Sequence, residues 1–123
     1  MWNVVFYTSS AGRQPVREFI EKDLDDVQRA KLRERLRLVQ THGPQMGDRY
    51  PKALSQLRGP RCRWLYEIRM ANDQTRVFLC FHKGEAVLLH GMRKAGKAGK
   101  TVRAQYEAAL IRRSDWLQRR CGK

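Results

Sequence analysis

The sequence predicts an α+β fold, with an N-terminal strand, two helices, an antiparallel sheet of three to four strands and a C-terminal helix. Between residues 63 and 94, three segments rich in β-branched and aromatic residues are separated by short turn-forming stretches. The segments before and after them carry apolar residues at helical spacing. With 123 residues and 41% hydrophobic content, the chain suffices for one hydrophobic core. Residues 1–123 are therefore expected to form a single domain.

Two helices are expected before the central segments. The first spans about residues 14–22, where apolar residues recur at helical spacing. The second spans about residues 25–40, has Asp23 or Asp25 as its cap, and ends at Gly43. Its predicted buried stripe consists of Leu24, Val27, Leu32, Leu36 and Val39.

The remaining elements are shorter or lie at the chain ends. Residues 2–7 alternate as a strand does, and residues 52–57 are expected to form a short edge strand. A loop is expected at residues 45–52. The last helix is predicted at about residues 100–118, with Tyr106 on its docking face. Its arginines, listed here, are expected to be solvated: Arg112, Arg113, Arg119 and Arg120.

The three central segments are expected to pair as consecutive antiparallel strands. A two-residue turn after His82 would set Arg76 opposite Gly91. A four-residue turn after Met70 would set Arg69 directly opposite Arg76.

Alternation along these strands sorts the side chains onto two faces. The expected core face carries Trp64, Tyr66, Ile68, Met70, Val77, Leu79, Phe81, Ala86, Leu88, His90 and Met92. The other, half-exposed face carries Arg63, Leu65, Glu67, Arg69, Arg76, Phe78, Cys80, Val87, Leu89 and Arg93. Facing arginines repel each other, which favours an anion site at this end of the sheet. Alternatively, both arginines extend into solvent, or Arg69 pairs with Glu67 or Asp73.

Charge indicates the class of partner. The formal net charge is +14 and the pI is near 10.6, so nucleic acid is the first candidate and an anionic membrane surface the second. No apolar run approaches membrane-spanning length and the N-terminus has no signal-peptide pattern, which favours a cytoplasmic protein. Three cysteines without C-x-x-C spacing and scattered histidines predict neither a disulfide framework, nor a metal centre, nor a cofactor.

A basic stretch follows the third central strand. Residues 93–103 hold five basic residues and no acidic one. They form either a flexible solvated loop or a cationic arm that binds phosphates. The residues assigned to binding nucleic-acid phosphates are Arg61, Arg63, Lys97, Lys100 and Arg103.

The residues LYEIR at 65–69, TRVF at 75–78 and VLLHGMRK at 87–94 carry a resemblance to a known family. In this order and at this spacing, the chain resembles the RelE/ParE superfamily of bacterial toxins, and most closely its HigB-like branch of phage-derived proteins. The resemblance extends over nearly the whole chain. It implies the toxin of a type II toxin-antitoxin system, namely a ribosome-dependent, metal-independent endoribonuclease (mRNA interferase). The implied partners are the ribosome, mRNA and a helix-turn-helix, HigA-like antitoxin.

Roles in such a reaction are assigned by position. Arg69 and Arg76 would grip the scissile phosphate, because a guanidinium donates two parallel hydrogen bonds to phosphate oxygens. Arg93 or Lys94 would complete the clamp. The candidate general base is Glu67, or else a lysine or arginine whose pKa is strongly lowered by its cationic neighbours. His90, on the expected core face, is either structural or catalytic. Two other functions stay open: a ParE-like gyrase inhibitor and a non-catalytic nucleic-acid-binding protein.

Overall fold

The computed structural model describes residues 1–59, 61–70, 74–93 and 99–121, without the side chains of residues 99–102 and 121. The elements are β1 (Asn3–Phe6), α1 (Pro15–Asp23), α2 (Asp26–His42), the short 3₁₀ helix η1 (Gly43–Gln45), α3 (Met46–Arg49), β2 (Leu54–Gln56), β3 (Tyr66–Arg69), β4 (Thr75–His82), β5 (Glu85–Arg93) and α4 (Gly99–Cys121). They form a five-stranded sheet in the order β1-β5-β4-β3-β2. Strand β1 pairs parallel to β5, and the other neighbours are antiparallel. The α+β fold class is confirmed.

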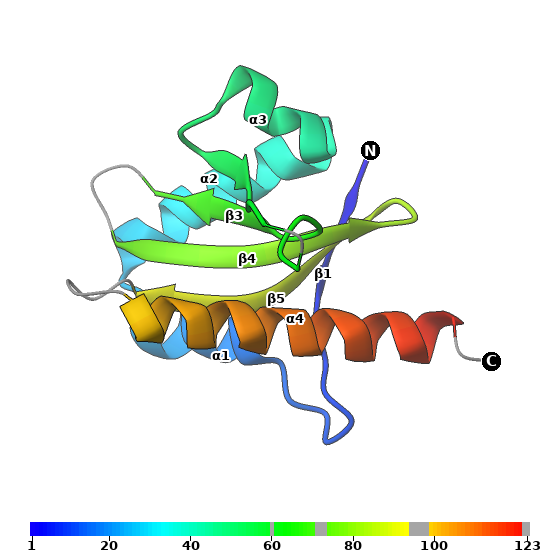
Figure 1. Cartoon of the computed structure of the whole chain (residues 1–123). Coiled ribbons are helices and arrows are strands. Elements are labelled where there is room, and N and C mark those ends of the chain that lie inside the picture. Colours follow the sequence, from blue (N-terminus) through cyan, green and yellow to red (C-terminus); the bar gives the residue numbers. More distant parts are fainter. Residues whose placement is uncertain (60, 71–73, 94–98, 122–123) are drawn as a thin grey trace.

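Helices cover both faces of the sheet (Figure 1). Helices α1 and α2 pack on one face, where Val16, Leu32 and Val39 join Ile68 and Leu88 in a buried cluster. Helix α4 packs on the other face over a second cluster, which contains Tyr7, Leu65, Phe78, Cys80, Val87, Leu89, Met92, Ala109 and Trp116. The sheet face that was expected to be half-exposed is therefore an interior layer beneath α4.

The register between β4 and β5 departs from the prediction after the first few pairs. His82 lies opposite Glu85, as predicted, but a β-bulge beside Phe78 then shifts the pairing by one residue. Arg76 consequently lies opposite Met92 and not opposite Gly91. Because alternate residues of a strand point to opposite faces, one extra residue in β5 moves each later side chain of that strand to the other face of the sheet.

Three residues of β5 exchange faces through this bulge. His90 and Met92 were predicted on the core face with Ile68 and Leu88, which lies under α1 and α2. Met92 instead belongs to the cluster beneath α4, and His90 stacks on Phe78, with 6.3 Å between ring centroids. Arg93 was predicted beside the other sheet arginines. Instead its Nη2 donates to the Asp23 carbonyl, and to Gln28 Oε1 at 2.8 Å, on the α1–α2 side.

The helices follow their local signals closely. Asp25 is the cap of α2: its carboxylate accepts from the Gln28 backbone N–H at 2.8 Å, and the Gln28 side chain accepts from the Asp25 backbone in return. Gly43 ends α2 with a φ of 59°, as predicted for a glycine cap. Val27, in contrast, is 65% exposed and does not belong to the buried stripe.

Two further expectations were wrong. Residues 45–52 do not form a simple loop, because η1 and α3 occupy most of this stretch. Trp64 was predicted in the core, but β3 begins only at Tyr66, and Trp64 lies in the preceding turn with 51% of its surface exposed.

Candidate functional site

One buried carboxylate links two arginines from neighbouring strands. Arg69 on β3 lies directly opposite Arg76 on β4, as the sequence predicted. The Glu67 Oε2 atom is 3.1 Å from Arg69 Nε, and its Oε1 atom is 3.4 Å from Arg76 Nε. Glu67 is only 6% exposed, and these two arginines are the cations that pair with its buried carboxylate. We call Glu67, Arg69 and Arg76 the arginine cluster.

The two arginines differ in their access to solvent. The Arg76 side chain is 15% exposed and also donates from Nη1 to the Thr75 carbonyl at 2.9 Å. The Arg69 side chain is 46% exposed, and among the described residues only its Nε is paired. A phosphate can therefore reach the terminal nitrogens of Arg69 directly, whereas Arg76 is fixed in the wall of the site.

Tyr106 brings α4 to the arginine cluster. Its ring meets Phe78 edge to face, with 5.3 Å between centroids, and Phe78 lies opposite Glu67 in the sheet. Burial, followed by the charge of Glu67, raises the pKa of the Tyr106 hydroxyl above its ordinary value of 10.0. Tyr106 therefore keeps its proton at neutral pH and can donate it. The sequence placed Tyr106 on the docking face of the last helix, but only the packing of that helix brings it beside the cluster.

The other residues that were assigned catalytic or RNA-binding roles either make different contacts or lie outside the described residues. Arg93 is on the opposite side of the sheet. Lys94, Lys97 and the side chain of Lys100 lie outside the described residues. Arg61 pairs with Glu107 at 2.8 Å, and the Arg63 guanidinium lies 4.8 Å from the centre of the Trp64 ring. Arg103 is exposed on α4.

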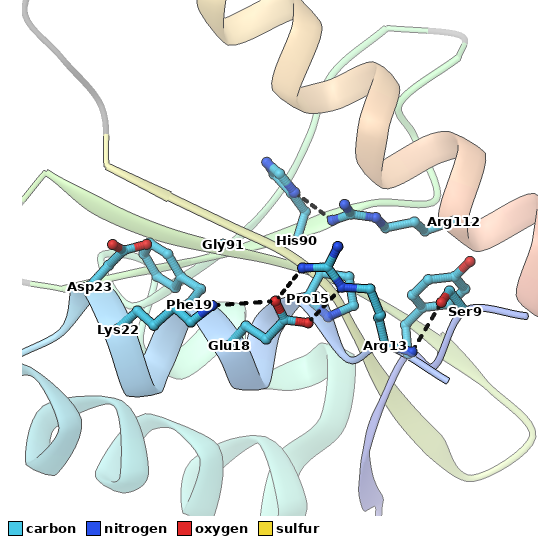
Figure 2. A pocket seen from close by; sticks show the side chains of 11 residues that line it. Ser9, Arg13, Pro15, Glu18, Phe19, Lys22, Asp23, His90, Gly91 and Arg112 are labelled. Carbon is cyan, nitrogen blue, oxygen red and sulfur yellow. Dashed lines mark hydrogen bonds and ion pairs between the residues drawn. The ribbon is translucent and has the colours of Figure 1, made fainter. Parts of the chain in front are cut away.

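A cavity of about 460 Å³ lies between α1, β5 and α4, beside His90. Figure 2 shows Arg112 reaching from α4 toward this histidine. Arg112 Nη1 donates to the Leu89 carbonyl at 3.0 Å and lies 2.6 Å from His90 Nδ1. Arg112 is therefore half-buried and not solvated as predicted. On the rim, the Arg13 Nη2 atom is 2.6 Å from the Glu18 carboxylate (Figure 2).

His90 is held by both ring nitrogens. Its Nδ1 faces Arg112 and accepts the hydrogen bond, so its Nε2 carries the proton and donates to the Gln105 side chain. Burial, together with the positive charge of Arg112, lowers the pKa of His90 from its ordinary value of 6.5. A neutral imidazole with both nitrogens engaged fits a structural role in joining β5 to α4.

The described part of the chain holds neither a cluster of metal ligands nor a membrane-spanning helix. No group of three or more His, Cys, Asp or Glu side chains there could hold a metal ion. Cys80 is buried, and burial raises the pKa of its thiol to about 11. No helix within the described ranges is long and apolar enough to span a bilayer.

A helix pair covers one face of the sheet, and a long C-terminal helix lies over the arginines on the other face. This architecture is consistent with the RelE-like fold. Residues 19–114 match the family model described as phage-derived protein Gp49-like (DUF891). The chain belongs to this family, which is a RelE/HigB-like toxin family. The matched region contains the whole arginine cluster and Tyr106. No curated protein shows a significant match to the chain.

Proposed function

We propose that this chain is the toxin of a type II toxin-antitoxin system and that it cleaves mRNA on the ribosome without a metal ion. Membership of a RelE/HigB-like toxin family supports the first part. The observation that carries the second part is the pair of arginines on neighbouring strands, oriented by one buried carboxylate. The protein would act in the cytoplasm and would be held inactive by a helix-turn-helix antitoxin.

RNA supplies its own nucleophile in the 2′-hydroxyl. The enzyme must take the proton from this group, stabilise the extra charge on the phosphate, and return a proton to the departing 5′-oxygen. Arg69 and Arg76 suit the second task, because guanidinium groups stay charged at any working pH and donate in pairs to phosphate oxygens. One preorganised donor of this kind typically contributes about 2.7–4 kcal/mol to transition-state stabilisation.

Proton transfer is assigned to the two other groups at the site. Tyr106 keeps its proton, because burial and Glu67 raise its pKa, and it suits the general acid that protonates the 5′-oxygen. Both oxygens of Glu67 face arginines, so its first role is to orient them. Glu67 can act as the base once a bound phosphate replaces it as a partner of Arg69.

The clamp proposed from sequence is revised in one respect. Arg93 contacts the start of α2 on the other side of the sheet, and we assign it to stabilising that junction. Lys94, which directly follows, remains a proposed member of the clamp. The basic residues of the arm, Lys97, Lys100 and Arg103, remain proposed contacts to ribosomal or messenger phosphates.

The test is to incubate the purified protein with translating ribosomes and to map new 5′ ends on the message. We expect discrete new ends with the wild type and none with Arg69→Ala or Arg76→Ala. Arg33→Ala, on the exposed face of α2, is the matched control and should behave as the wild type. Inhibition of gyrase supercoiling without any new 5′ end would contradict the proposal and would favour the ParE-like alternative.

A further inference from the structure

Trp64 is a large apolar side chain on the surface. It lies in the turn before β3 and is 51% exposed, whereas Trp116 is 9% exposed. Two guanidinium groups lie over its ring: that of Arg63 at 4.8 Å and that of Arg113, from α4, at 5.4 Å from the centroid. Such cation–π contacts hold the ring at the surface between the turn and α4.

The two guanidinium groups at this ring have no acidic partner among the described residues. In contrast, Arg61 in the same turn pairs with Glu107 at 2.8 Å. The next arginines along α4 are also neutralised, each by a carboxylate: Arg119 by Asp115 and Arg120 by Glu85. An uncompensated pair of cations beside an exposed aromatic ring is therefore a local feature of this surface. It matches a ligand that combines negative charge with a flat apolar face.

The position of Trp64 relates it to the arginine cluster. Tyr106 and Arg113 are seven residues apart on α4, which places them on the same side of the helix, roughly 10 Å apart along its axis. Along the chain, Trp64 lies in the turn three residues before Glu67, so their Cα atoms are at most roughly 10 Å apart. An RNA strand bound at the arginine cluster and continuing along α4 would reach Trp64 within a few nucleotides.

We propose that Trp64, Arg63 and Arg113 form a base-stacking subsite for single-stranded RNA. Proteins bind unpaired RNA by stacking bases on aromatic rings while cations bind the flanking phosphates. Neither guanidinium is fixed by a carboxylate, so either can turn toward a phosphate and free a face of the indole for a base. The subsite extends the proposed function, because it supplies the path of the RNA strand beyond the cleavage point.

The test uses a 2′-O-methylated single-stranded RNA oligonucleotide, which lacks the nucleophile and reports binding alone. We expect binding to quench tryptophan fluorescence in the wild type, and Trp64→Ala to remove the quenching and to lower affinity about 5- to 150-fold. Trp64→Phe should retain most of the affinity. Ile111→Ala, which changes another exposed apolar residue of α4, is the matched control and should bind as the wild type.

A second measurement separates stacking from a general loss of binding. In a series of oligonucleotides with one abasic nucleotide each, one position should weaken the wild type but have no further effect on Trp64→Ala. Equal binding by wild type and Trp64→Ala, failure of Trp64→Phe to retain affinity, or the absence of any coupled position would overturn the subsite. Trp64-dependent binding without cleavage on ribosomes would refute only the nuclease function, and cleavage that Trp64→Ala leaves unchanged at low ribosome concentration would refute only the subsite.

Discussion

Replacing Arg76 by alanine should damage both stability and activity, and the two effects can be separated. Arg76 is the more buried partner of Glu67, and its loss leaves a carboxylate of 6% exposure paired only with Arg69, whose side chain is 46% exposed. An incompletely satisfied buried charge of this kind costs about 1–3 kcal/mol. With a urea m-value of about 1–3 kcal/mol per M, the unfolding midpoint should fall by roughly 1 M.

The double variant Glu67→Gln with Arg76→Ala separates the two effects. Glutamine keeps the shape of the side chain and removes the buried charge, so most of the lost unfolding free energy should return. Cleavage should not return, because one phosphate donor and the proposed base are both missing, and the rate at saturating ribosome should stay at least about 10²- to 10³-fold below that of the wild type.

The assays are urea unfolding and single-turnover cleavage on ribosomes, with Arg69→Ala as a companion variant. Arg69→Ala should lower cleavage with a smaller loss of stability, because its side chain is half-exposed. If the double variant regained cleavage with its stability, the role of Arg76 would be purely structural. If Arg76→Ala were as stable as the wild type, the account of Glu67 as a buried charge that needs both arginines would be wrong.

Three further predictions concern Tyr106, Gly91 and His90. Tyr106→Phe keeps the contact with Phe78 but removes the proton donor, so the single-turnover rate should fall by about 10²-fold while the urea midpoint stays nearly unchanged. An unaltered rate would exclude Tyr106 as the general acid. Gly91→Ala would drive a Cβ atom into the Phe19 ring, so chemical denaturation should show a loss of about 1–3 kcal/mol, and wild-type stability would contradict the close packing of α1 on β5. Burial lowers the pKa of His90 in the folded state, so the unfolded chain binds a proton at this residue more readily. The free energy of unfolding should therefore decrease as the pH falls from 6.5 toward the folded pKa. His90→Gln should weaken this pH dependence, and an identical pH dependence in the variant would count against a buried neutral histidine.

Much of the fold could be predicted because its elements carry local signals. Asp25 and Gly43 mark the ends of α2 by their capping chemistry, and the turn after His82 sets the first pairs of the β4–β5 hairpin. The bulge beside Phe78 has no comparable sequence signature, because an extra residue in a strand changes neither composition nor apolar content. This one residue accounts for the wrong faces of three β5 residues: His90, Met92 and Arg93.

The sequence was likewise sufficient to predict one part of the candidate site and not the other. Arg69 and Arg76 could be placed opposite each other because only a few residues separate their strands in the sequence, and Glu67 follows by alternation. The sequence placed Tyr106 on the docking face of α4 and Arg113 in solvent, but it could not predict their neighbours, because these depend on how α4 crosses the sheet. Trp64 is aromatic, as strand residues often are, and it was predicted to be buried in the sheet. The strand, however, starts two residues later.

In the proposed mechanism, the arginine cluster promotes attack by the 2′-hydroxyl of RNA on the scissile phosphate. The most direct test places a single 2′-deoxynucleotide immediately 5′ of a mapped cleavage site in an otherwise unmodified message on the ribosome. We expect the unmodified message to yield a 2′,3′-cyclic phosphate and a 5′-hydroxyl end, and the deoxy message not to be cut at that position. Cleavage of the deoxy message at the same rate would show that the nucleophile is not the 2′-hydroxyl and would contradict the proposed mechanism.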